Sequence, residues 1–172
     1  MQSNIAPVAS SPIRPDAASR PAGTFLYRFE AQLSPTSIGL VPEGLLMANA
    51  FEGTVTDGLL RGGRVWGVDH LLIRSDGISV IDAPKTISLG NVHLFEHVRG
   101  YCVPPEGLQL PPLEALLEPG FSWPDIPFRV TATSTFRVAD QELAHLRAAI
   151  AVIEGRVWFA TGRLEITTRL VG

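Results

Sequence analysis

Histidine and glutamate side chains provide most of the acid-base chemistry that this sequence could perform. A general acid or base at neutral pH is most often an imidazole, whose ordinary pKa is about 6.5, or a buried carboxyl group with a raised pKa. The residues of this kind that we expect to be catalytic are His70, Glu96, His97 and His145. For His70 and His145, a second interpretation as surface or hydrogen-bonded structural histidines stays open.

The segment from Val92 to Tyr101 decides which of these groups could act together. As a β-strand it would place alternate side chains on opposite faces. One face holds His93, Phe95, His97, Arg99 and Tyr101, and the other holds Val92, Leu94, Glu96 and Val98. Because aliphatic residues usually face the core, the pattern favours the second face as the inner one, with Glu96 buried and its pKa raised. The opposite orientation would turn two imidazoles, a guanidinium and a phenol inward.

Metal, cofactor and hydrolase chemistry have little support. His93 and His97 would stand roughly 13 Å apart on a strand, too far to share a metal ion. Ser, His and Asp are all present, but the Gly-x-Ser-x-Gly motif is absent. Asp69 and His70 are adjacent, so on a strand they point to opposite faces and do not form a dyad. We expect neither a cofactor nor a metal.

Several aromatic and polar side chains are candidates for binding a ligand. They are Tyr27, Trp66, Arg99, Tyr101 and Trp123. Large aromatic residues are more often core or rim residues than ligand-stacking ones, and that interpretation stays open for them. Cys102 is expected to be a buried apolar residue, since its neighbours offer no base to activate it.

Short strands separated by turns are expected to hold these side chains. Alternation from Thr24 to Leu33 indicates a half-buried strand, with Phe25, Tyr27, Phe29, Ala31 and Leu33 on one face and Leu26 on the other. Turns are expected at Ser34-Pro35-Thr36 and at Pro42-Glu43-Gly44. Asp76-Gly77 predicts a tight hairpin, and Gly90-Asn91 predicts a second. The pattern favours an all-β fold, a single antiparallel β-barrel with an internal cavity.

The rest of the chain adds a long connection and one or two short helices. Seven prolines between Val103 and Pro127 exclude a central strand, so this segment is expected to be a lid-like loop with a short helix near Leu113 to Leu117. After the strand 128–138 we expect a short helix to about Leu146, then a hairpin turning near Gly155. Residues 1–22 are expected to be a flexible tail and residues 23–172 the barrel domain.

Composition excludes several classes of partner. The formal net charge is −3 and Lys85 is the only lysine, so no basic patch for nucleic acid is expected. No stretch of about 20 apolar residues could cross a membrane, and residues 1–22 lack the apolar core of a signal peptide. The single cysteine excludes an internal disulfide. We therefore expect a cytoplasmic protein whose partner is a small apolar or aromatic molecule.

Ordered landmarks give the chain a family resemblance. Pro42-Glu43-Gly44, Phe51-Glu52-Gly53, Leu60-Arg61-Gly62, the run 72–77 and Val98-Arg99-Gly100 occur in the order typical of the domain-of-unknown-function 3237 family. The resemblance implies a calycin-like or allene-oxide-cyclase-like barrel with a cavity, but no single activity. His70 and His145 stand where that family typically has Trp, and Pro84 stands where it typically has Arg.

Three functions are compatible with this sequence. The first is a cofactor-independent lyase, isomerase or cyclase that uses acid-base chemistry within the barrel. The alternative is a binding barrel that carries a small ligand unchanged. The third is an assembly domain whose exposed strands pair with another copy to form a homo-oligomer.

Overall fold

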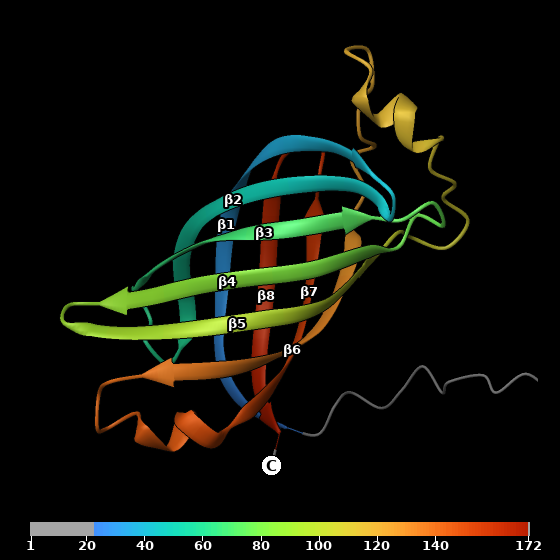
Figure 1. Ribbon diagram of the computed structural model, residues 1–172. Coiled ribbons are helices and arrows are strands. Elements are labelled where there is room, and N and C mark those ends of the chain that lie inside the picture. The colour runs from blue at the N-terminus through green and yellow to red at the C-terminus, as the bar shows by residue number, and fades with distance from the viewer. Residues whose placement is uncertain (1–22, 172) are drawn as a thin grey trace, which may run out of the picture.

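The described residues, 23–171 of the computed structural model, form a closed barrel of eight antiparallel strands (Figure 1). Neighbouring strands follow the order of the sequence, and the first strand closes the barrel against the last. The strands are β1 (Gly23–Val41), β2 (Gly44–Gly58), β3 (Arg64–Ile73), β4 (Ser79–Leu89), β5 (Val92–Val103), β6 (Phe128–Val138), β7 (Ile150–Trp158) and β8 (Arg163–Val171). The prediction of an all-β antiparallel barrel is confirmed. The expected tail, residues 1–22, lies outside the described residues.

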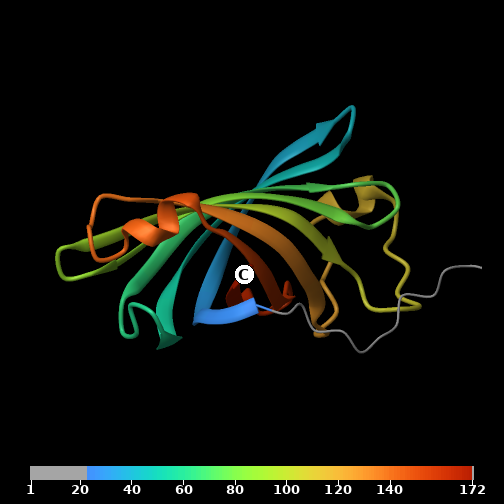
Figure 2. The ribbon, with the colours of Figure 1, turned by 90° about the horizontal axis from the view of Figure 1, so that it is seen from below.

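Two short 3-10 helices complete the chain, η1 (Leu113–Leu117) and η2 (Ala144–Ala148). They lie at opposite ends of the barrel (Figures 1 and 2). Both were expected from the sequence, η1 within the proline-rich connection and η2 just before the strand that begins at Ile150. Among residues 23–171, no helix is long and apolar enough to cross a membrane.

Tight turns between consecutive strands make this topology possible. Gly77 and Gly90 have φ angles of +81° and +58°, a region that glycine enters without a steric penalty. They lie in the β3–β4 and β4–β5 connections, as the Asp76-Gly77 and Gly90-Asn91 pairs predict. Short hairpins keep successive strands adjacent, and the barrel closes when β1 meets β8.

The expected turn at Ser34-Pro35-Thr36 is wrong. β1 runs straight through it to Val41, and the chain reverses at Pro42-Glu43, where the second turn was expected. Beyond Gln32, β1 pairs with β2 along one edge, and its other edge is no longer paired with β8. The missing N–H of Pro35 on that second edge therefore costs no ladder hydrogen bond. This hairpin projects from the barrel in Figure 2, where it is drawn in blue and cyan.

Two further details of the strand pattern are wrong. Register shifts near Phe25 break the alternation of β1, so Leu26 and Tyr27 are both buried while Phe25 is exposed. Gly155 does not turn a hairpin but lies within β7 opposite Ile166, where a Cβ atom would collide with the carbonyl oxygen of Glu165. The turn between β7 and β8 comes after Trp158.

The connection between β5 and β6 packs against one end of the barrel. Leu110, Leu113, Leu116 and Trp123 are partly buried against the core. Trp123 contacts Phe128 and Phe159, with ring centroids 5.8 and 4.9 Å apart. Apolar side chains of this connection therefore cover the barrel end that Phe159 helps to line.

Candidate functional site

The barrel wall has a break between β3 and β4. Their residues pair from Arg64 to Gly67 and again at Leu72 and Ile73, but not between. In this interval the backbone N–H of Asp82 donates a hydrogen bond to the Asp69 side chain, with 3.1 Å between N and Oδ1. Pro84, on the same stretch of β4, has no backbone N–H and cannot donate a hydrogen bond to β3. The carboxyl group of Asp69 thus takes the place of a main-chain acceptor in the wall.

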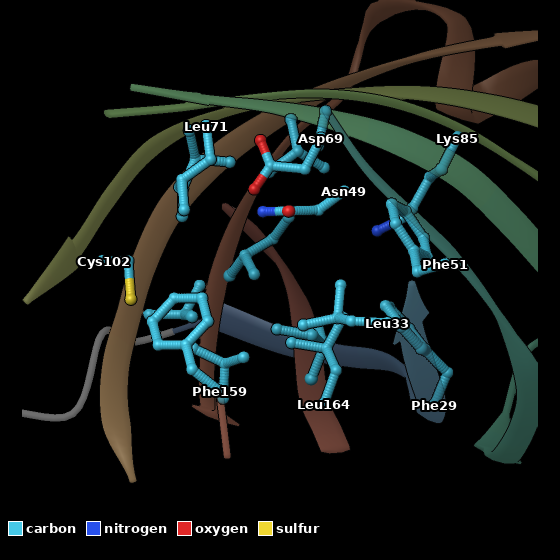
Figure 3. A pocket seen from close by; sticks show the side chains of 17 residues that line it. Phe29, Leu33, Asn49, Phe51, Asp69, Leu71, Lys85, Cys102, Phe159 and Leu164 are labelled. Carbon is cyan, nitrogen blue, oxygen red and sulfur yellow. The ribbon is translucent and has the colours of Figure 1, made fainter. Parts of the chain in front are cut away.

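Asp69 also lines a cavity inside the barrel. The cavity has a volume of about 60 Å³, enough for a few water molecules or the reactive end of a small ligand. All eight strands contribute to its lining, which is mostly aliphatic and aromatic. Its polar or sulfur-bearing side chains are Asn49, Asp69, Lys85 and Cys102. Figure 3 shows Asn49, Asp69 and Lys85 along one side, with Phe159, Leu164 and Phe29 opposite.

Asn49 and Asp69 form a polar pair in this lining. They occupy opposite positions in the β2–β3 ladder, so both side chains project from neighbouring strands into the cavity. Asn49 is 3% exposed, and its Oδ1 atom has no hydrogen-bond partner among residues 23–171. A buried amide oxygen without a partner is uncommon, because its burial costs free energy that a hydrogen bond would recover. A polar group on a ligand would supply that partner.

Burial raises the pKa of Asp69 from its ordinary 3.8 to about 7. The hydrogen bond from the Asp82 backbone opposes this rise, and the negative charge of the Asp82 side chain adds to it. A carboxyl group with such a pKa is present in both protonation states at neutral pH. It can therefore accept or donate a proton under those conditions.

A second polar cluster is formed by Lys85 of the lining with the buried side chains of Glu96 and Tyr27. Lys85 on β4 and Glu96 on β5 are direct ladder partners, with 3.2 Å between Nζ and Oε2. The hydroxyl of Tyr27 donates a hydrogen bond to the same Glu96 oxygen. Burial lowers the pKa of Lys85, against the opposing effect of the Glu96 charge. For Tyr27, burial and the Glu96 charge raise the pKa well above its ordinary value.

Gly67 makes the approach of these groups possible. It faces Lys85 across the β3–β4 ladder and Phe51 across the β2–β3 ladder. A Cβ atom at position 67 would lie 2.8 Å from the Phe51 ring and 2.9 Å from the Lys85 Cβ atom. The missing side chain leaves the space in which Lys85 and Phe51 border the cavity.

Cys102 contributes shape rather than reactivity. Burial, assisted by the charge of Asp69, raises the pKa of its thiol to about 12. The reactive thiolate form is therefore scarce at neutral pH. The sequence-based expectation of a buried apolar residue agrees with this environment.

The face of β5 that points inward is the one the sequence favoured. Glu96 is fully buried, and Leu94 and Val98 lie on the same face, whereas Arg99 and Tyr101 are exposed. Glu96 is not the only buried acid-base group, however, because Lys85 pairs with it and Asp69 lies nearby in the lining.

The predicted catalytic histidines lie outside the cavity. His70 is exposed on the outer face of β3, and His145 is exposed on η2. His97 is partly buried on the outer face of β5, where its Nε2 atom lies 2.5 Å from Asp82 Oδ1. Contact with His97 and the charges of Arg99 and His70 lower the pKa of Asp82. The structure thus gathers His70, His97 and Arg99 around Asp82, on the far side of the wall from the cavity.

The predicted ligand-binding residues are also dispersed. Tyr27 is fully buried in the core and contacts Glu96 instead of lining the cavity. Trp66 borders an outer groove, and the Arg64 guanidinium carbon lies 4.9 Å from the centroid of the Trp66 ring. Tyr101 is 52% exposed on the outer face, and Trp123 packs into the end of the barrel.

Three cavity residues were missed by sequence reasoning, and a strand-phase signal could have found them. Asp69 is in phase with Val65 and Leu71 on β3, and Lys85 is in phase with Ile81 and Ile87 on β4. Asn49 is likewise in phase with Leu45, Phe51 and Val55 on β2. A polar residue in phase with core residues is placed inside the barrel. Within the described range, no three His, Cys, Asp or Glu side chains are grouped to hold a metal ion.

Comparison with known proteins supports the fold and does not assign an activity. No protein-family model matches the chain, and no curated protein matches it. Similar solved structures include a conserved protein of unknown function from Rhodopseudomonas palustris, with 18% identity, a TM-score of 0.61, and 86% of this chain and 95% of that chain covered. A protein of unknown function from Clostridium acetobutylicum has 17% identity and a TM-score of 0.67, with 86% and 97% covered.

A third similar structure is described as a β-barrel-like protein from Acinetobacter baumannii. It has 16% identity and a TM-score of 0.64, with 90% of this chain and 99% of that chain covered. At such identities the likeness concerns the fold alone. The barrel implied by the family resemblance is supported, and membership of the domain-of-unknown-function 3237 family stays a prediction.

Proposed function

We propose that this barrel is a cofactor-independent enzyme that moves a proton on a small, largely apolar metabolite, as a lyase, isomerase or cyclase does. Asp69 is the general acid-base residue in this proposal. The observation that carries it is a carboxyl group with a pKa of about 7 that lines an apolar cavity.

The lining accounts for the rest of the chemistry. Asp69 in its carboxylate form removes a proton from a carbon next to a carbonyl group, and its carboxylic acid form returns that proton elsewhere on the ligand. Negative charge then develops on the carbonyl oxygen. The Asn49 amide and the Lys85 ammonium group are the hydrogen-bond donors of the lining that can stabilise this charge. The surrounding aliphatic and aromatic side chains exclude water, which strengthens these interactions.

The experiment is α-proton exchange in heavy water. Small enolisable ketones and aldehydes, beginning with butanone, are incubated with the full-length protein, and loss of the α-proton signal is followed by NMR. We expect the wild-type protein to accelerate exchange and Asp69→Asn to lose about 10²- to 10⁴-fold of that rate. Asp125→Asn, at an exposed carboxyl group that does not line the cavity, serves as the matched control and retains exchange. Equal rates with wild type and Asp69→Asn would contradict the proposal.

A carrier that binds its ligand unchanged is the second candidate. The mostly hydrocarbon lining of the cavity favours it, because apolar burial alone can hold a small ligand. A carrier would give ligand-dependent shifts in the signals of the cavity methyl groups but no acceleration of exchange. The same samples therefore separate the two functions.

A further inference from the structure

Lys85 lines the cavity, and the proposed function uses only its charge and its hydrogen-bond donors. It is the only lysine in the sequence and is 3% exposed. Its side chain borders the cavity, as Figure 3 shows, and its Nζ atom lies 3.2 Å from Glu96. Lysine is normally a surface residue, so a buried lysine that borders a cavity is a candidate for a chemical role.

We propose that Lys85 is an amine nucleophile that forms an imine with an aldehyde or ketone entering the cavity. The inference goes beyond the proposed function, because imine formation needs the cavity and Lys85 but not proton transfer by Asp69. It assigns the substrate class as carbonyl compounds small enough to reach Nζ.

Glu96 supplies the base that such a lysine needs. An ammonium group is not a nucleophile, so Nζ must first lose a proton. Glu96 Oε2 is within hydrogen-bonding distance, and both side chains are almost fully buried. Transfer of one proton from Nζ to Oε2 converts the ion pair into a neutral amine and a neutral acid, which removes the cost of burying two charges. Burial, which lowers the pKa of Lys85, acts in the same direction.

The chemical step balances without any further reactant. The neutral Nζ atom attacks the carbonyl carbon, and a C–N bond forms as the C=O π bond breaks. One proton moves from Nζ to the former carbonyl oxygen, which gives the hydroxyl group of a carbinolamine. Glu96 returns its proton to that hydroxyl group, the C–O bond breaks and water leaves. The products are a protonated imine on Lys85, the Glu96 carboxylate and one water molecule, with the net charge unchanged.

The surroundings of Nζ suit both the amine and the protonated imine. Nζ lies 4.8 Å from the ring centroid of Phe29 and 5.6 Å from that of Tyr27. Aromatic faces stabilise a nearby cation, so a protonated imine keeps the favourable contact that the ammonium group has. Oε1 of Glu96 has no hydrogen-bond partner within the described part of the chain, so one carboxyl oxygen is free for the departing water.

Reductive trapping tests this inference in the full-length wild-type protein. The protein is incubated with propanal and sodium cyanoborohydride, and the adducts are located by peptide mass mapping. Only Lys85 and the amine at the start of the chain can react, so the second amine is an internal reference. We expect Lys85 to be alkylated at least about tenfold faster than the reference amine. An unmodified Lys85 in protein whose reference amine is alkylated would overturn the inference.

Variants identify the roles of the two residues. Lys85→Arg keeps a positive charge beside Glu96 but cannot form an imine, so only the reference amine should react. Glu96→Gln keeps the lysine and removes its proton acceptor, and we expect at least about tenfold slower trapping at Lys85. Unchanged trapping in Glu96→Gln would overturn the role of Glu96. The wild-type map decides the inference even where a variant fails to fold, and it does not depend on the outcome of α-proton exchange.

Discussion

Asn49 and Asp69 face each other across the β2–β3 ladder and both project into the cavity, where Asp69 also accepts a hydrogen bond from the backbone of Asp82. This relationship joins a titratable carboxyl group to an amide that still has hydrogen-bonding capacity for a ligand. In the proposed function, proton transfer occurs at this pair inside the barrel rather than at the histidines on its surface.

The raised pKa of Asp69 predicts how stability changes with pH. The native protein holds the Asp69 proton up to about pH 7, whereas the unfolded chain releases it near pH 3.8. Between these pH values the native state binds more protons than the unfolded state. The contribution of Asp69 to the free energy of unfolding therefore falls as pH rises and is lost above pH 7. The full loss is about 4 kcal/mol at most. In Asp69→Asn this contribution is absent.

Urea unfolding at pH 5, 6, 7 and 8 measures this effect. The free energy of unfolding of Asp69→Asn, relative to wild type, should rise between pH 5 and 7 and then level off. A difference that stays constant with pH would show that the Asp69 pKa is not raised by folding.

The Lys85–Glu96 pair is predicted to behave as one energetic unit. Lys85→Met or Glu96→Leu leaves its former partner charged and buried, which should cost about 3–5 kcal/mol of unfolding free energy. The double variant buries neither charge, so we expect it to be more stable than either single variant. Urea unfolding of the four proteins gives the coupling energy. Additive losses of unfolding free energy in the double variant would contradict the prediction. The control is Arg64→Met, which breaks the exposed ion pair with Glu52 and should change the free energy of unfolding little.

Gly67 is predicted to be required for the shape of the cavity. In Gly67→Ala the new methyl group meets the Phe51 ring, the Lys85 Cβ atom and the carbonyl oxygen of Pro84. Overpacking of this kind should cost about 1–3 kcal/mol and shift the cavity residues. Gly120→Ala, at a site with no atom within 4 Å of the added group, is the matched control. Equal melting temperatures for the two variants would show that the wall can adjust around Gly67.

The surface histidines are predicted to be dispensable for proton exchange. His70 and His145 are both exposed outside the barrel, so the double variant His70→Phe, His145→Phe should exchange ketone α-protons within about twofold of the wild-type rate. The measurement is the heavy-water assay described above. Loss of exchange with an unchanged melting temperature would move the active site to the outer surface, near Asp82.

Turns and alternation were enough to predict the barrel, because each hairpin depends on a few local residues. Asp76-Gly77 and Gly90-Asn91 specify their turns through glycine conformations, and β6 alternates without interruption from Phe128 to Val138. The predictions of local structure were wrong where strand pairing overrides the conformational preference of the local sequence. β2 holds β1 extended through Pro35, and a bulge reverses the phase at Phe25.

The candidate site was only partly predictable, for a related reason. The inner face of β5 followed from its aliphatic residues, and it gave Glu96. The sequence marks Asp69 only as a neighbour of His70, and Lys85 only as the single lysine. Their importance depends on the break between β3 and β4 and on the register with β2 and β5. These relationships join residues that are distant in sequence, so the strand phase, which places each side chain inside the barrel, does not predict which of these side chains meet.

The proposed function requires that Asp69 be present in both protonation states at neutral pH inside the cavity. The most direct measurement is a pH titration of the carboxyl carbon signals by NMR in ¹³C-labelled protein, with the Asp69 signal identified by its loss in Asp69→Asn. We predict a midpoint of about 7 for Asp69, and a lower midpoint in Asp82→Asn because a nearby negative charge is removed. A midpoint near the ordinary value of 3.8 would contradict the account.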